Sequence, residues 1–127
     1  MIAIIDYGVG NLFSLKSSLD FIGLDTKITN NEKEIREADA IILPGVGAFR
    51  DAIEKLEEKN LKSIIIEEAQ NGKILLGICL GMQLLFEKSY EYGEYTGLGL
   101  IKGEICSLKN DLKNKDLNSY AVPMNVH

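Results

Sequence analysis

Cysteine, tryptophan and clustered positive charge are the scarce features of this 127-residue sequence. Its two cysteines, Cys79 and Cys106, are too few for a disulfide framework or a cysteine-rich zinc site. Lysine and arginine number 14 against 19 acidic residues, and no basic cluster stands apart from the acids. The positive surface that nucleic-acid phosphates require is therefore missing. We expect free thiols, no metal, no cofactor and no nucleic-acid partner.

Long hydrophobic runs are also absent, since no apolar stretch approaches the ~20 residues that cross a bilayer. The opening "MIAIIDYG" has neither the basic region nor the apolar run of a secretory signal. We therefore expect no membrane association and a cytoplasmic location. With 46% hydrophobic and 26% charged residues, the composition is that of an ordinary soluble protein. The length predicts a single domain over residues 1–127.

Apolar runs alternate with helical periodicity along most of the chain. Strands are predicted at 2–5, 25–29, 40–43 and 73–78, and helices near 12–22, 31–39, 49–56 and 61–69. This alternation predicts a doubly wound α/β fold with a mostly parallel sheet. Met82, Leu85 and Phe86 are expected to form the buried stripe of the next helix. Cys106, within the strand-like "EICSL", is expected to be a small buried side chain.

The segment "GICLG" at residues 77–81 places a cysteine between two glycines, directly after a predicted strand and before a predicted helix. G-x-C-x-G is the nucleophile elbow with cysteine in place of serine. Such a turn holds its central side chain exposed in a strained backbone, and the flanking glycines avoid collisions with adjacent elements. A helix N-terminus also favours the thiolate. The pattern therefore predicts that Cys79 is a nucleophile.

A second loop, "PGVG" at 44–47, follows the preceding strand of the predicted sheet. Ligands of open parallel sheets gather at the carboxyl ends of the strands, so this loop should face Cys79. The N–H of Leu80 would stabilise an oxyanion, and Gly45 and Gly47 would let the loop supply a second donor. Gln83, one helical turn after Cys79, could hold a polar substrate, or could be a solvated residue on the helix face.

The segments "IAIIDYGVGNLFSL", "PGVGAFRDAIEKL" and "GICLGMQLLFEKSYE" resemble class I glutamine amidotransferases. The likeness is to the glutaminase subunits of imidazole glycerol phosphate synthases, and it covers about the first hundred residues. It implies an enzyme that hydrolyses glutamine to glutamate and ammonia. The ammonia would pass to a cyclase subunit with a (β/α)8 barrel, for imidazole glycerol phosphate synthesis in histidine biosynthesis.

The resemblance also implies roles for single residues. Cys79 would form a glutamyl thioester, with Leu80 and the Val46–Gly47 peptide as the oxyanion hole. Gln83 and Glu91 would hold the glutamine head group, although Glu91 could equally be an exposed loop carboxylate.

Asn11, in the loop "DYGVGN" at 6–11, would lie toward the cyclase. A helix N-cap is the alternative role for Asn11, and the two roles could coexist.

The sequence departs from the family in its acid–base residues. A cysteine nucleophile of this kind needs a base, and the family supplies one from an H-x-E-type segment that is absent here. The one histidine, His127, is the last residue, and "VPMNVH" keeps only part of the family's pattern near position 120. We therefore expect the chain to be the N-terminal part of the domain, incomplete at its C-terminal side and inactive alone.

Two other functions remain open from the sequence. The chain could be a glutaminase paralogue that supplies ammonia to a sugar-modifying enzyme. It could also be a non-catalytic protein that only binds a partner through the 6–11 loop.

Overall fold

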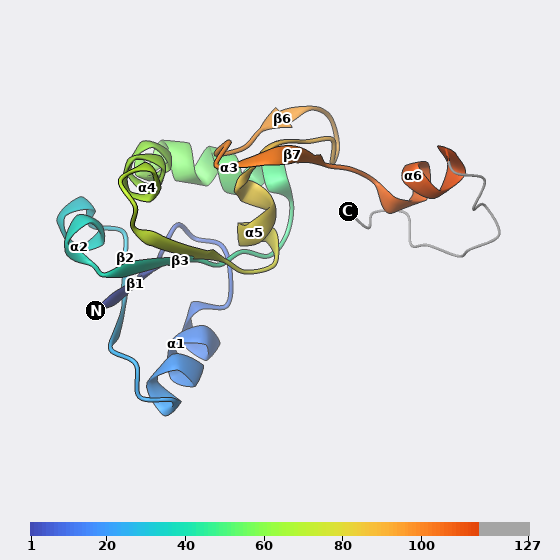
Figure 1. Cartoon of the computed structure of the whole chain (residues 1–127). Coiled ribbons are helices and arrows are strands. Elements are labelled where there is room, and N and C mark those ends of the chain that lie inside the picture. Colours follow the sequence, from blue (N-terminus) through green and yellow to red (C-terminus); the bar gives the residue numbers. More distant parts are fainter. Residues whose placement is uncertain (115–127) are drawn as a thin grey trace.

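Four short strands, of which all but β2 are apolar, form a parallel sheet in the order β2-β1-β3-β4 (Figure 1). The computed structural model describes residues 1–114, so His127 and the 122–127 stretch lie outside the described residues. The strands are β1 (Ile2–Ile5), β2 (Thr26–Thr29), β3 (Ala40–Leu43) and β4 (Ile74–Gly77). In register, Ile4 of β1 is paired with Ile28 of β2 and Ile42 of β3. Each predicted strand is confirmed.

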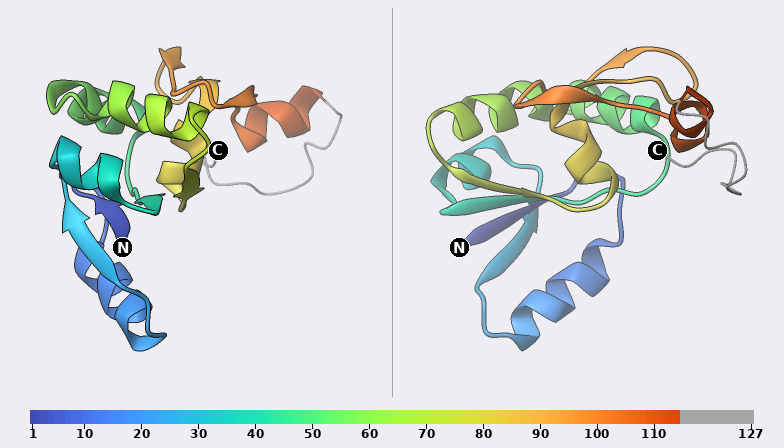
Figure 2. Two further views of the ribbon diagram at one scale, coloured as in Figure 1. Left: turned by 60° about the vertical axis from the view of Figure 1, so that its left-hand side comes forward. Right: turned by 45° about the vertical axis from the view of Figure 1, so that its right-hand side comes forward.

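Helices cover both faces of this sheet, as Figure 2 shows. On one side lies α1 (Leu12–Phe21). On the other lie α2 (Glu32–Glu37), α3 (Phe49–Glu58), α4 (Leu61–Gln70) and α5 (Leu80–Leu84). The predicted doubly wound α/β architecture is therefore confirmed. Within residues 1–114, no helix has both the length and the apolar character that a membrane crossing needs.

The hydrophobic core lies between the sheet and the α2–α5 side. Helix α3 buries side chains at helical spacing, and α4 adds a second apolar stripe. The fully buried core includes Ile5, Ile35, Leu43, Phe49, Leu56 and Ile65. By contrast, α1 has no fully buried side chain, and Phe13 and Phe21 are 80% and 91% exposed. The core therefore supports the α3 side of the sheet more firmly than the α1 side.

After α5 the chain forms a second, three-stranded sheet in the order β6-β5-β7. Its strands are β5 (Phe86–Ser89), β6 (Tyr95–Thr96) and β7 (Ile101–Ile105), and α6 (Leu108–Asn114) follows. Strand β5 pairs antiparallel with β6 and parallel with β7. This small sheet holds the loop that carries Glu91 beside the N-terminus of α3.

Two burial predictions in this region are wrong. The expected stripe of Met82, Leu85 and Phe86 does not form, because α5 ends at Leu84 and Phe86 begins β5. Backbone N–H groups of residues 98–101 donate to the carbonyls of Leu84, Leu85 and Phe86, which draws the chain into the second sheet. Of the three residues only Leu85 is buried, and Met82 is 42% exposed. Cys106 is exposed, because it follows the last residue of β7, which pairs on one side with β5.

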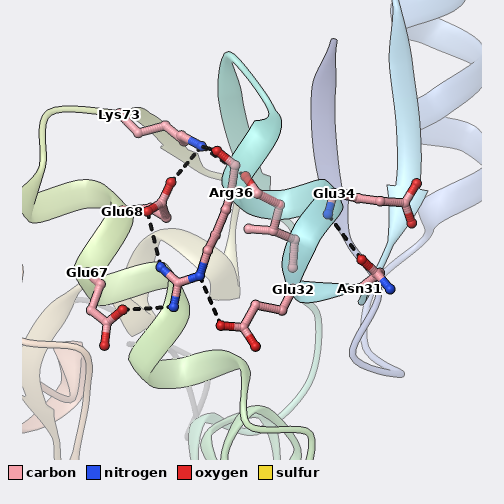
Figure 3. A network of polar contacts seen from close by, with 8 residues as sticks. Asn31, Glu32, Glu34, Arg36, Glu67, Glu68 and Lys73 are labelled. Atoms are coloured by element: carbon pink, nitrogen blue, oxygen red, sulfur yellow. Dashed lines mark hydrogen bonds and ion pairs between the residues drawn. The ribbon is translucent and has the colours of Figure 1, made fainter.

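An ion-pair network joins α2, α4 and the start of β4 (Figure 3). Arg36 contacts Glu32 on its own helix at 2.9 Å, and Glu67 and Glu68 on α4 at 2.8 and 3.3 Å. Lys73 binds Glu68 at 2.7 Å and donates to the Arg36 carbonyl at 2.6 Å, at the C-terminal end of α2. The network fixes how α2 sits against α4. The pairs of Arg36 with Glu32 and Glu67 lie at the surface and add little stability, whereas the side chains of Lys73 and Glu68 are only 11% and 13% exposed.

Two neighbouring substitutions on α2 compare what a buried side chain and a surface charge contribute to the free energy of unfolding. Ile35→Ala removes a fully buried side chain and should lower the free energy of unfolding by about 2–5 kcal/mol. Arg36→Gln removes a guanidinium whose side chain is 36% exposed, and should cost less than about 1 kcal/mol. Urea unfolding followed by circular dichroism measures both. Equal effects of the two substitutions would contradict this account of the core.

Candidate active site

Cys79 occupies a sharp corner between β4 and α5. Its backbone has φ of +55° and ψ of −120°, which is a strained conformation for a residue with a side chain. It is the N-cap of α5, and its thiol-bearing side chain is exposed. The strained and exposed elbow that the G-x-C-x-G pattern predicts is therefore present in the structure.

The flanking glycines are required by close contacts. A Cβ on Gly77 would lie 2.6 Å from the Met82 Cα atom, in the first turn of α5. A Cβ on Gly81 would overlap the backbone carbonyl of Leu43, at the end of β3. Because real Cβ atoms do not approach backbone this closely, only glycine lets α5 start directly against the strands.

The elbow and the 44–47 loop lie in contact, as predicted. The N–H of Ile78 donates to the Leu43 carbonyl at 3.0 Å, and the N–H of Leu80 donates to the Gly45 carbonyl at 3.2 Å. A Cβ on Gly45 would lie 3.1 Å from the Leu80 Cβ atom. The predicted oxyanion donor is thus beside the loop, but in this structure it is bonded to the loop's own carbonyl.

Val46 and Gly47 form the outer part of the same loop. The Val46 side chain is 61% exposed, and Gly47 has φ of +99°, a region that favours glycine. A Cβ on Gly47 would meet nothing within 4 Å, so the space around it is open. The exposed position suits a donor that faces a ligand, and a role for the Val46–Gly47 peptide stays a prediction.

Tyr7 is a residue of this region that sequence reasoning missed. It lies in the 6–11 loop, is fully buried, and its hydroxyl donates to the Pro44 carbonyl at 2.5 Å. Burial raises the pKa of the Tyr7 hydroxyl, so the group stays protonated and acts as a donor. The available signal was a tyrosine two residues after the predicted strand at 2–5.

Of the remaining predicted site residues, Glu91 and Asn11 accept hydrogen bonds from the backbone. Gln83 is half-buried on α5, one turn from Cys79. The Glu91 carboxylate accepts the N–H of Phe49 at 3.3 Å, at the first residue of α3. The Asn11 side chain accepts the N–H of Ser14 at 3.3 Å, so its alternative role as the N-cap of α1 is confirmed. Binding roles for Gln83 and Glu91 and an interface role for Asn11 stay predictions.

Comparisons with known proteins indicate the family of the chain. Residues 3–120 match the CobB/CobQ-like glutamine amidotransferase domain. The imidazole glycerol phosphate synthase subunit HisH of Oceanobacillus iheyensis is 54% identical over 113 residues, which are 89% of this chain and 56% of that protein. The subunit of the same name from Aquifex aeolicus is 51% identical over 111 residues, 87% of this chain and 54% of that protein.

A solved structure supports the fold. The crystal structure of a glutamine amidotransferase superposes with a TM-score of 0.71 at 20% sequence identity, covering 84% of this chain and 56% of that chain. The present chain spans about half the length of the curated relatives it matches.

Substitution at Gly81 tests whether the close approach of α5 to β3 holds the site together. Gly81→Ala should destabilise the fold by roughly 3 kcal/mol or more, because the new methyl group overlaps the Leu43 carbonyl. Gly72→Ala is the matched control: it has φ of +94° but nothing within 4 Å, so it should cost about 1–2 kcal/mol. Urea unfolding measures both. If Gly81→Ala is no worse than Gly72→Ala, the described contact is wrong.

Proposed function

Because this chain belongs to the CobB/CobQ-like glutamine amidotransferase domain family, we propose that it carries the nucleophile side of a glutaminase. The reaction would release ammonia from the side-chain amide of glutamine. One observation carries the proposal: Cys79 is exposed on a strained elbow, with the Leu80 N–H directly beside the 44–47 loop. This arrangement suits nucleophilic attack on a carbonyl carbon followed by stabilisation of the resulting oxyanion.

The chemistry proceeds through a thioester. The Cys79 thiolate forms a bond to the amide carbon of glutamine, and the carbonyl electron pair moves onto oxygen. Collapse of this tetrahedral species breaks the carbon–nitrogen bond, and the nitrogen takes up a proton and leaves as ammonia. Water then adds to the glutamyl thioester, and the sulfur departs as thiolate with release of glutamate.

The oxyanion needs a donor that the structure currently uses elsewhere. The Leu80 N–H can bind a substrate oxygen only when the Gly45 carbonyl, its present acceptor at 3.2 Å, moves aside. Because Gly45 has no side chain, the peptide group that follows it, which carries this carbonyl, can rotate. We infer that, on substrate binding, the Leu80 N–H releases the Gly45 carbonyl and donates to the substrate oxygen instead.

The glutamine head group would be held by Gln83 and Glu91. Gln83 lies on α5 one turn beyond Cys79. Glu91 lies beside the start of α3, where it accepts the Phe49 N–H and has further interactions. A carboxylate placed there suits the α-amino group of glutamine. Glu91 would therefore both hold the start of α3 and bind the substrate.

Residues 1–114 contain no histidine, and we assign the proton acceptor of the reaction to none of these described residues.

We propose that ammonia passes to a cyclase subunit with a (β/α)8 barrel, for imidazole glycerol phosphate synthesis in histidine biosynthesis. The 51–54% identity to subunits of that synthase supports this assignment. Asn11 and its loop would face that subunit, because the loop follows β1 at the same sheet edge as the elbow. The reaction would take place in the cytoplasm, where thiols remain reduced.

The two exposed cysteines provide a direct test. A chloroketone analogue of glutamine should alkylate Cys79, forming a carbon–sulfur bond with loss of chloride. Iodoacetamide, which has no glutamine-like group, should label both Cys79 and Cys106. Peptide mass spectrometry should show at least about a tenfold preference of the chloroketone for Cys79, the effect of one or two directed hydrogen bonds.

Free glutamine should slow the chloroketone reaction at Cys79 and leave labelling of Cys106 unchanged. Cys79→Ser should remove the glutamine-protected label, whereas Cys106→Ser should keep it. Equal labelling of both cysteines by both reagents, without protection by glutamine, would contradict the proposed function.

A further inference from the structure

Tyr7 links the 6–11 loop to the loop proposed to form the oxyanion hole. Its ring is fully buried, and its hydroxyl donates to the Pro44 carbonyl across 37 positions of sequence, at 2.5 Å. Packing alone would be satisfied by phenylalanine, so the buried hydroxyl points to a need for this hydrogen bond. A buried phenol without an acceptor would be costly, and Pro44 provides that acceptor.

The contacts around Pro44 and Gly45 are tight on both sides. A Cβ on Gly45 would lie 2.7 Å from the Tyr7 hydroxyl oxygen and 2.9 Å from the Gly81 nitrogen. Gly45 is therefore held between Tyr7 and the first turn of α5. Gly10 approaches from the 6–11 loop, where a Cβ would lie 3.3 Å from the Pro44 Cβ atom. The peptide group between Pro44 and Gly45 therefore has little room to shift while the Tyr7 hydroxyl is in place.

The Pro44 carbonyl and the Gly45 N–H belong to the same planar peptide group. A hydrogen bond that fixes the oxygen therefore fixes the orientation of the whole plane. The next carbonyl along the chain, that of Gly45, is the present acceptor of the Leu80 N–H. The Tyr7 hydroxyl thus holds the first peptide group of the 44–47 loop in place, and the residues that follow it can still rotate.

We propose that Tyr7 is a positioning residue for the oxyanion hole: by holding the Pro44 carbonyl, it sets the 44–47 loop against Leu80 and Cys79. The proposal rests on the proposed glutaminase function and adds a residue to it. Tyr7 does not touch the reacting atoms. Its removal should disturb stabilisation of the substrate oxygen and leave the thiol itself as exposed and as reactive as before.

The test compares two alkylating reagents on Tyr7→Phe in the full chain, with Cys106→Ser as background. The chloroketone analogue of glutamine needs its carbonyl placed at Leu80, whereas iodoacetamide reports the thiol alone. Tyr7→Phe should slow the chloroketone reaction at Cys79 about tenfold, the effect of a misplaced hydrogen-bond donor. The iodoacetamide rate should stay within about twofold, because the thiol is unchanged.

Tyr95→Phe is the matched control, since the Tyr95 hydroxyl also donates to a backbone carbonyl, that of Tyr92, at 3.3 Å. Neither rate should change in Tyr95→Phe. This proposal alone would be overturned if Tyr7→Phe left the ratio of the chloroketone rate to the iodoacetamide rate at Cys79 unchanged, while the chain with both cysteines still showed the chloroketone preference for Cys79. If the chloroketone showed no preference for Cys79 in the unsubstituted chain, the proposed function would be contradicted, and this proposal with it.

Amide hydrogen exchange distinguishes positioning from general support of the fold. In Tyr7→Phe, the Leu80 N–H, which donates to the Gly45 carbonyl of the loop, should exchange faster while β1 and β3 keep their protection. If β1 and β3 lose protection together with Leu80, Tyr7 acts in folding only, and the positioning role is wrong.

Discussion

The close approach of α5 to the end of β3 is the contact on which the candidate site depends. Gly81 lies so near the Leu43 carbonyl that a side chain at this position would overlap it. The N–H of Ile78 binds the same carbonyl at 3.0 Å, so the elbow is fastened to β3 on both sides of Cys79. Because of this contact, the strained backbone of Cys79 stays in place, and its exposed side chain lies beside the 44–47 loop rather than within the core.

The strand order explains why three distant segments meet there. Strands β1, β3 and β4 are neighbours in a parallel sheet, so the loops that follow them emerge at one edge. These are the 6–11 loop, the 44–47 loop and the Cys79 elbow. Tyr7 joins the first to the second, and Leu80 joins the third to the second. A movement of the 44–47 loop therefore changes the contacts of the Cys79 elbow and of the 6–11 loop, which is proposed to face a partner subunit.

Most of the fold was predictable because its signals are local. Buried parallel strands read as continuous apolar runs, and the amphipathic stripes of α3 and α4 repeat at helical spacing. The elbow was predictable because the G-x-C-x-G pattern stands directly after a predicted strand and before a predicted helix. The Met82–Phe86 stripe failed because hydrogen bonds from residues 98–101, remote in sequence, ended α5 early. Tyr7 was missed for the same reason, since its acceptor lies 37 residues away.

The central claim is that a carbonyl oxygen held by Cys79 reaches the Leu80 N–H. A crystal structure of the chain alkylated at Cys79 by the chloroketone analogue measures this directly. The account predicts the ketone oxygen within about 3 Å of the Leu80 nitrogen, with the Gly45 carbonyl displaced from that donor. A ketone oxygen directed into solvent, with the Leu80 N–H still bonded to Gly45, would contradict the account.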